Sequence, residues 1–277
     1  MEIPFVKLQG NGNDFVLIDE IAGSVIPDDM KGEFAKLYCD RRFGIGADGI
    51  LFISKPQDSS KADIRMRLFQ PDASEAEMCG NGIRCLAKYA YDCDRIKHSA
   101  RIETMAGILE VECGYNDSEE FSATIEMGKV IYDRKDIPAT GSGDYEENIG
   151  GYTVNAANTG VPHAVIFIED LEGLDICAEA PQIRHHRSFP KGTNVNFAKV
   201  TGKDEITIRT FERGVEGETY SCGTGSTASA AIAFKTGRTG NVVHVNTKGG
   251  PLTIKIEDGR AKMTGPATTV FSGSIRM

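Results

Sequence analysis

Apolar and polar residues alternate with a period of two along several short stretches of this 277-residue chain, and this pattern predicts a protein rich in β-strands. The predicted strands fall at 15–19, 49–54, 64–70, 123–128, 164–169, 194–200 and 206–212. Two stretches differ, because apolar and small residues recur with helical spacing at 80–90 and 223–234. The pattern therefore indicates an α/β chain in which two helices interrupt a series of strands.

The same succession of segments occurs twice along the chain. Strand 64–70 leads through a turn-rich loop to Cys79-Gly-Asn-Gly and a helix, and strand 206–212 leads in the same way to Cys222-Gly-Thr-Gly and a helix. The segment "TMAGIL" at 104–109 returns as "TKGGPL" at 247–252, at the same offset as the two cysteines. An internal repeat of this length predicts two halves with one architecture. A polar, turn-forming stretch at 113–122 is the predicted linker, and 139–151 is predicted to be a surface loop.

Composition and charge narrow the class of partner. The formal net charge is −9 and no basic cluster is present, which disfavours nucleic acid and anionic membrane surfaces and favours a small-molecule substrate. No signal peptide and no apolar run of membrane-spanning length is found, so we expect a cytoplasmic protein. The seven cysteines are irregularly spaced and are expected to be free thiols, and their spacing fits no common metal motif.

The two Cys-Gly-x-Gly segments carry the candidate chemistry. A cysteine at the start of a helix lies beside unpaired backbone N–H groups at the positive end of the helix dipole. Such a position binds a carboxylate and lowers the pKa of a thiol from about 8.5 towards neutrality. Two of these sites facing one amino acid would place a thiolate and a thiol on opposite sides of its α-carbon. This layout suits inversion of a stereocentre by proton removal on one face and proton delivery on the other.

The chain resembles the diaminopimelate epimerases over nearly its whole length. The resemblance rests on "GNGNDFVLID" (10–19), "FGIGADG" (43–49), "PDASEAEMCGNGIRC" (71–85), "ETMAG" (103–107), "NTGVPHAV" (158–165), "GTNVNF" (192–197), "ERGVEGET" (212–219) and "CGTG" (222–225). It implies an α/β (α+β) fold of two pseudo-symmetric halves, each a mixed β-sheet wrapped around a central helix. The expected halves are 1–120 joined by a C-terminal strand at 266–277, and 121–265, with the active site in the cleft between them.

The resemblance also implies an activity and a set of site residues. It implies a cofactor-independent, metal-free epimerase that interconverts LL- and meso-2,6-diaminopimelate in lysine biosynthesis. Cys79 and Cys222 match the family's paired acid and base, and His163 and Glu212 match residues that assist them. The residues that match substrate contacts are Asn13, Gln70, Gly80, Asn81, Asn194, Glu212, Arg213, Gly223 and Thr224.

Some alternatives stay open at the level of sequence. Gly49, Gln70 and Val161 depart from the commoner family pattern, although Gln70 keeps an amide on a longer arm. These departures leave room for a cofactor-independent racemase of another amino acid, such as a histidine-type enzyme. A non-catalytic module that binds an anion or phosphate at its two helix starts is the alternative of another class. Family resemblance further suggests a homodimer formed through the first half, although Phe271 stands where some members use a tyrosine at that contact.

Overall fold

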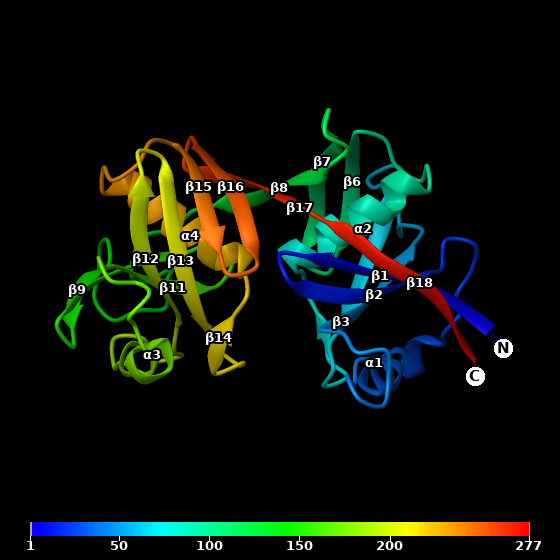
Figure 1. Cartoon of the computed structure of the whole chain (residues 1–277), viewed down its shortest axis with the longest axis horizontal. Coiled ribbons are helices and arrows are strands. Elements are labelled where there is room, and N and C mark those ends of the chain that lie inside the picture. The colour runs from blue at the N-terminus through cyan, green and yellow to red at the C-terminus, as the bar shows by residue number, and fades with distance from the viewer. Residues whose placement is uncertain (1, 277) are drawn as a thin grey trace. The chain divides into compact units, whose positions relative to one another are not determined.

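The computed structural model describes residues 2–276, which divide into two compact units (Figure 1). Unit 1 comprises the chain up to Ile125 together with the segment from Gly265 onward, and unit 2 comprises Glu126–Thr264. The chain therefore changes unit inside two strands, β8 and β17, rather than in loops. Each unit combines a mixed sheet with helices, which confirms the predicted fold class.

Unit 1 holds the first eight strands, the first two helices and the last strand. Its elements are β1 (Glu2–Gly10), β2 (Asn13–Asp19), the 3-10 turn η1 (Asp28–Met30), α1 (Lys31–Tyr38), β3 (Gly49–Ser54), β4 (Ile64–Phe69), β5 (Glu75–Ala76), α2 (Gly80–Asp92), β6 (Ser99–Thr104), β7 (Gly107–Tyr115), β8 (Phe121–Lys129) and β18 (Thr268–Arg276).

Unit 2 repeats this succession. Its elements are β9 (Glu146–Ile149), β10 (Tyr152–Asn158), β11 (Pro162–Phe167), α3 (Ile176–Arg184), β12 (Asn194–Gly202), β13 (Glu205–Glu212), β14 (Gly217–Thr219), α4 (Gly223–Lys235), β15 (Val242–Thr247), β16 (Gly250–Glu257) and β17 (Arg260–Pro266).

Strand pairing establishes the duplication in detail. Unit 1 has the order β18–β1–β2–β3–β4–β6–β7–β8, with β5 paired to β4. Unit 2 has the order β9–β10–β11–β12–β13–β15–β16–β17, with β14 paired to β13. In unit 1 the pairs β2–β3 and β4–β6 are parallel, and their counterparts β11–β12 and β13–β15 are the parallel pairs of unit 2. The predicted internal repeat is therefore confirmed strand by strand.

In each unit the sheet curves around one helix. Helix α2 contacts β1, β2, β3, β4, β7 and β18, and helix α4 contacts β10, β11, β12, β13, β15 and β16. Residues 225–233 of α4 are buried without interruption, and they are Gly, Ser, Thr and Ala apart from one Ile. Small side chains on every side of a helix take up little space, so strands can pack closely against it from all sides. The second run of helical sequence therefore forms a central helix, as predicted.

The other helix of each unit covers the outer face of its sheet. Strand residues alternate between the two faces, so Val16 and Ile18 pack with Phe34 of α1, whereas Phe15 and Leu51 lie towards α2. In unit 2 the corresponding outer cluster joins α3 to β10, β11, β12 and β13. Neither α1 nor α3 was predicted from the sequence.

Two expectations about loops were wrong. Residues 113–122 are not a linker, because β7 and β8 pair across them with Cys113 opposite Ala123. The Asn116 side chain accepts hydrogen bonds from the backbone N–H groups of Ser118 and Glu120 at 2.9 Å each, which closes a hairpin turn. The stretch 139–151 is not wholly a loop either, because it contains β9, which pairs with β10. Short polar strands of this kind lack the apolar alternation that reveals a strand in sequence.

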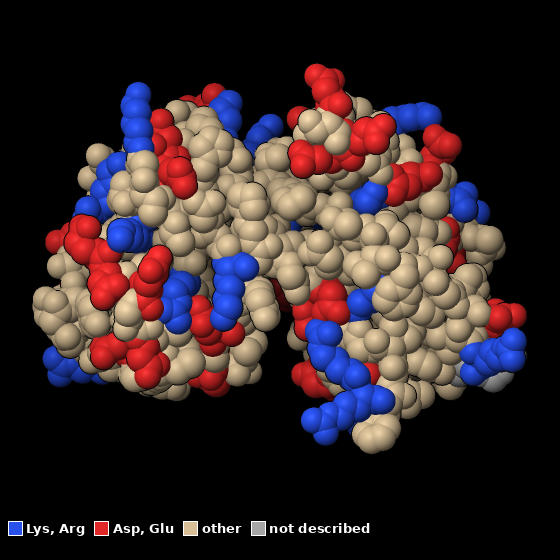
Figure 2. Space-filling view, in the orientation of Figure 1, with Lys and Arg blue, Asp and Glu red and all other residues tan. Residues whose placement is uncertain are grey.

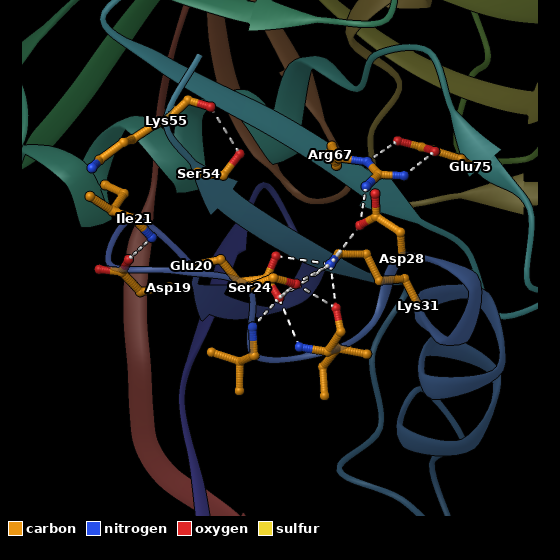
Figure 3. A network of polar contacts seen from close by, with 12 residues as sticks. Asp19, Glu20, Ile21, Ser24, Asp28, Lys31, Ser54, Lys55, Arg67 and Glu75 are labelled. Carbon is orange, nitrogen blue, oxygen red and sulfur yellow. Dashed lines mark hydrogen bonds and ion pairs between the residues drawn. The ribbon is translucent and has the colours of Figure 1, made fainter. Parts of the chain in front are cut away.

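A buried ion pair anchors α1 in unit 1 (Figure 3). The Nζ atom of Lys31 lies 2.9 Å from Oε2 of Glu20 and donates a 2.7 Å hydrogen bond to the carbonyl of Ile26. It also lies 4.8 Å from the centre of the Phe52 ring. Towards the surface, Arg67 joins Asp28 to Glu75. The network ties the loop before α1 to the sheet.

The charged residues of the surface are mixed in sign. On the face shown in Figure 2, Lys and Arg side chains lie among Asp and Glu side chains in both units. Within residues 2–276, no helix is long and apolar enough to cross a membrane.

Candidate active site

Each candidate cysteine occupies the residue before a central helix. Cys79 is the N-cap of α2 with φ −141° and ψ 121°, and Cys222 is the N-cap of α4 with φ −125° and ψ 111°. The extended backbone turns each chain into its helix at this residue, so Gly80 and Gly223 begin the helices as predicted. Backbone N–H groups in a first turn lack partners within the helix, which makes both positions suitable for an anion.

The last glycine of the second Cys-Gly-x-Gly segment, Gly225, is required by close packing, whereas its counterpart Gly82 has room for ordinary van der Waals contact. A Cβ atom at Gly225 would lie 2.5 Å from Oδ1 of Asn196, and one at Gly82 would lie 3.4 Å from Cβ of Cys79. The distance at Gly225 is shorter than real Cβ atoms tolerate. Glycine therefore lets α4 begin directly against the sheet.

In unit 1, two predicted residues, Asn13 and Asn81, meet at Cys79. Its Sγ atom donates to Oδ1 of Asn13 at 3.6 Å, and Nδ2 of Asn81 donates to the same oxygen at 3.3 Å. Nδ2 of Asn13 donates to Oδ2 of Asp48 at 2.6 Å. Asp48 was missed in the sequence, although it lies in the quoted segment 43–49. It fixes the orientation of the Asn13 amide, since a carboxylate oxygen accepts the hydrogen bond from the nitrogen side.

The Arg84 side chain holds the first turn of α2 in place through hydrogen bonds. This fully buried side chain donates to Oδ1 of Asn81 at 2.9 Å, to Oδ1 of Asn11 at 2.6 Å and to the carbonyl of Pro266 at 3.2 Å. It thereby holds the Asn81 amide and the returning C-terminal segment in one position. The sequence reasoning missed this residue, because a lone arginine on a helix is ordinarily interpreted as a surface residue.

Gln70 and Gly49 complete the predictions made for unit 1. Gln70 is exposed in the turn between β4 and β5, where its carbonyl accepts a hydrogen bond from the N–H of Ala73. Gly49 is buried at the start of β3, and a Cβ atom there would lie 2.7 Å from Cδ1 of Leu68. A larger residue at position 49 would therefore require Leu68 to move.

In unit 2, Cys222 lies among groups that act on its proton in opposite directions. Burial and the carboxylate of Glu212, to which the thiol hydrogen-bonds, raise the pKa of Cys222 above its ordinary value. Thr224 and the backbone N–H of Gly225 lower it. Oγ1 of Thr224 lies 3.4 Å from the sulfur. The expected net lowering of this pKa by the helix start is therefore wrong, because burial and a nearby negative charge outweigh two hydrogen-bond donors.

His163 reaches Cys222 through Thr224. Its Nε2 atom lies 2.9 Å from Oγ1 of Thr224, and its Nδ1 atom lies 3.1 Å from Nδ2 of Asn196. The imidazole is completely buried, and burial, helped by the charge of Arg213, lowers the pKa of His163 to about 3. His163 is therefore neutral near pH 7. Asn196 was missed, although it follows Asn194 by two residues and so lies on the same face of β12.

Asn194 and Arg213 form a second pair in unit 2. Oδ1 of Asn194 accepts a 2.8 Å hydrogen bond from the backbone N–H of Arg213, and its Nδ2 donates to the carbonyl of Pro162. The Arg213 guanidinium contacts the carbonyls of Lys191 and Gly192 at 3.3 and 3.4 Å. The Asn194 side chain thus holds the loop that carries Arg213, and carbonyl contacts leave the guanidinium's positive charge available for a carboxylate.

The buried neutral histidine predicts an acid-sensitive stability. An unfolded His163 binds a proton below about pH 6.5, whereas the folded residue binds one only near pH 3, so between these values the unfolded state holds more protons. Stability should therefore fall as pH is lowered through this window, by about 1.4 kcal/mol per pH unit for this residue. Urea unfolding at pH 7.0 and 5.0 measures it. The double variant His163→Phe/Asn196→Leu should lose about 2 kcal/mol less than the wild type between these pH values. Equal losses would contradict the assignment of a neutral buried imidazole.

Comparison with known proteins identifies the family. The model of the diaminopimelate epimerase family matches residues 5–132 and 155–270. The chain is 50% identical over 275 residues to the diaminopimelate epimerase of Methanothrix thermoacetophila, covering 99% of this chain and 96% of that protein. It is 50% identical over 280 residues to that of Archaeoglobus fulgidus, covering 100% and 98%, and 41% identical over 277 residues to that of Pelotomaculum thermopropionicum, covering 97% of each.

Solved structures share the fold at low sequence identity. A Bacillus anthracis phenazine biosynthesis protein of the PhzF family matches with a TM-score of 0.74 at 16% identity, covering 100% of both chains. A hydroxyproline epimerase from Agrobacterium vitis matches with a TM-score of 0.66 at 18% identity, covering 99% of this chain and 91% of that one. These likenesses concern the fold alone. The full-length matches at 50% identity and the family model together show that this chain belongs to the diaminopimelate epimerase family of isomerases.

Proposed function

We propose that this chain interconverts LL- and meso-2,6-diaminopimelate by a two-base mechanism that uses Cys79 and Cys222. The observation that carries the proposal is that equivalent central helices of two duplicated units each begin directly after a cysteine. One thiolate takes the proton from the α-carbon, and the other thiol delivers a proton to the opposite face. The C–H bond is broken and remade with no net change of atoms, and the configuration inverts. The mechanism requires both sulfurs to approach one α-carbon, one on each face.

The surroundings of Cys222 suit a residue that alternates between acid and base. Its raised pKa makes it a thiol that can deliver a proton. When it must act as a base, Glu212 accepts the thiol proton, and the donors from Thr224 and Gly225 stabilise the sulfur that has lost it. The first-turn amides of Gly80, Asn81, Gly223 and Thr224 hold the reacting carboxylate in this proposal, with Asn13, Gln70 and Asn194 nearer the rest of the substrate.

Arg213 is the basis for the dicarboxylic substrate, because a guanidinium can bind a distal carboxylate through two hydrogen bonds. Losing a hydrogen bond to a charged group costs about 1.5–3 kcal/mol, so Arg213→Gln should lower kcat/KM for diaminopimelate by roughly ten- to a hundredfold. Arg187→Gln, a change at an exposed arginine, is the matched control and should leave kcat/KM within twofold. Lysine, which lacks the distal carboxylate, should be a poor substrate of the wild type. Equal rates on lysine and diaminopimelate would count against this substrate.

The decisive experiment is incubation of the reduced protein with LL-diaminopimelate in D2O, followed by chiral analysis and mass spectrometry of the α-position. We expect inversion with incorporation of deuterium at the α-position. The activity should need no added pyridoxal phosphate and should persist when metals are removed by chelation. A non-catalytic anion-binding module would exchange no α-hydrogen. Exchange confined to another amino acid, such as histidine, would favour a racemase of that substrate instead.

The proposal includes a homodimer formed through unit 1. Two exposed apolar residues on β18 support the dimer: Val270 is 55% exposed and Phe271 is 47% exposed. Phe271 packs edge-on against Phe5 at 5.9 Å, which keeps its ring in place on the strand. Light scattering of the wild type and of Phe271→Glu tests the homodimer. A monomeric wild type would contradict it.

A further inference from the structure

A chain of buried hydrogen bonds runs from β12 through His163 to the sulfur of Cys222. It begins at Asn196, whose Nδ2 atom lies 2.9 Å from the carbonyl of Ala164 and 3.1 Å from Nδ1 of His163, while its Oδ1 accepts from Oγ1 of Thr210 at 3.0 Å. A backbone carbonyl can only accept, so the amide atom facing both Ala164 and His163 must be the NH2 group. The orientation of this amide is therefore determined by the backbone.

The orientation of Asn196 determines which nitrogen of His163 carries the proton. Nδ1 of the imidazole accepts from the Asn196 amide, so in the neutral ring the proton is on Nε2. Nε2–H then donates to Oγ1 of Thr224, at 2.9 Å. The Thr224 hydroxyl has one proton of its own, and the sulfur of Cys222 is 3.4 Å away to accept it. Every donor in the chain thus points towards the sulfur.

The duplicated fold supplies an internal control for this chain. The contacts of the equivalent glycine near each helix start identify the counterparts, which are Phe15 and Leu51 around Gly82, and His163 and Asn196 around Gly225. The register agrees, because Phe15 and His163 occupy the parallel pairs β2–β3 and β11–β12 at matching positions. In unit 1, Phe15 and Leu51 therefore fill the space that two buried polar side chains, His163 and Asn196, fill in unit 2. Burying polar groups costs stability relative to this apolar solution, so the fold alone does not require them.

The two half-sites differ in the hydrogen-bonding groups that face their sulfurs, because Cys222 faces the Thr224 hydroxyl in addition to the acceptor Glu212. In unit 1 the Asn13 amide is oriented by Asp48 so that its oxygen accepts the hydrogen bond of the Cys79 thiol. In unit 2 the Thr224 hydroxyl donates towards Cys222. An acceptor favours the protonated thiol, whereas a donor favours the thiolate.

We infer that Asn196 is a positioning residue that selects the Nε2–H tautomer of His163, so that Thr224 donates its hydrogen bond to Cys222 and supports the thiolate form of that cysteine. This inference rests on the proposed function, in which Cys222 acts as acid and base. The hydrogen bond from Thr224 offsets in part the effects of burial and of the charged residue Glu212, which both raise the pKa of Cys222. The charge of Arg213 contributes to the low pKa of His163.

Two substitutions at Asn196 separate this role from a structural one. Asn196→Asp has the same shape but presents oxygen to Nδ1, which selects the Nδ1–H tautomer and turns the Thr224 proton away from the sulfur. Asn196→Leu copies Leu51 and leaves the tautomer unselected. The first readout is the pH dependence of alkylation by iodoacetamide, followed by peptide mass spectrometry, with Cys79 as the reference in the same sample.

Below its pKa, Cys222 should be alkylated roughly tenfold more slowly in Asn196→Asp and severalfold more slowly in Asn196→Leu than in the wild type, because a hydrogen bond to the thiolate is lost. The profile of Cys79 should be unchanged in both. The same pair of substitutions made in a Thr224→Val background should have no further effect, since the hydroxyl that transmits the tautomer is absent. An effect that persists there would be electrostatic and would overturn the inference, as would unchanged Cys222 profiles.

The second readout is independent of thiol access. Nitrogen NMR of the imidazoles should show His163 as Nε2–H in the wild type and as Nδ1–H in Asn196→Asp, and an Nδ1–H wild type would overturn the inference. Failure of the proposed function is distinguishable. A normal tautomer and alkylation response without α-hydrogen exchange would reject the diaminopimelate reaction alone, whereas normal epimerisation with the wrong tautomer would reject the positioning role alone.

Discussion

Replacing either Cys79 or Cys222 with alanine should lower the rate of epimerisation roughly 10²–10⁴-fold, because inversion needs a proton carrier on both faces of the α-carbon. The measurement is conversion of LL- to meso-diaminopimelate by chiral chromatography. Each variant should keep the wild-type unfolding transition, since both cysteines are only half-buried at the starts of their helices. Cys177→Ala, a change at an exposed cysteine, is the matched control and should retain full activity.

Deuterium exchange makes the assignment of faces testable. A variant that keeps one cysteine keeps one proton carrier, so any residual α-hydrogen exchange should be confined to one epimer and proceed without inversion. Cys79→Ala and Cys222→Ala should then differ in which epimer exchanges. A variant that retains a sizeable fraction of wild-type turnover, or two variants that exchange the same epimer, would contradict the paired-cysteine mechanism.

Replacing Lys31 with methionine should lower the free energy of unfolding by about 3–5 kcal/mol. The substitution leaves the buried carboxylate of Glu20 without its cation, and removing one partner of a buried pair costs far more than the pair itself contributes. Urea or thermal unfolding followed by circular dichroism measures the change. Lys36→Met on the same helix is the control, because Lys36 is exposed and lies 3.9 Å from the exposed Glu33, so its loss should cost less than about 1 kcal/mol.

The double variant Glu20→Gln/Lys31→Met separates charge from packing. It removes the uncompensated carboxylate, while the amide oxygen of a glutamine can still accept from the backbone N–H groups of Val25 and Ile26. We therefore expect it to recover part of the lost stability, with an interaction energy between the two sites of about 1–3 kcal/mol. Simple additivity would mean that the ion pair is not what stabilises this corner of unit 1.

Local pattern was enough to determine the elements that are defined by contiguous sequence. The strands at 64–70 and 206–212 were predictable because alternation reports the two faces of a sheet directly. The helix starts after Cys79 and Cys222 were predictable because glycines mark the change of backbone direction, and the repeat was visible because duplicated units keep their order of elements. The family, and with it the fold, followed from segments that lie in one order along the chain.

Tertiary structure alone decided what depends on partners distant in sequence. The linker at 113–122 was mistaken because a polar turn looks the same whether it joins two strands or two units. The expected lowering of the Cys222 pKa was wrong because helix position can be read locally, whereas burial and the approach of Glu212 cannot. Asp48 and Asn196 orient site residues through side-chain hydrogen bonds that span 35 and 33 positions of sequence. Such contacts are set by strand register and packing, which no local pattern of hydrophobic and polar residues encodes.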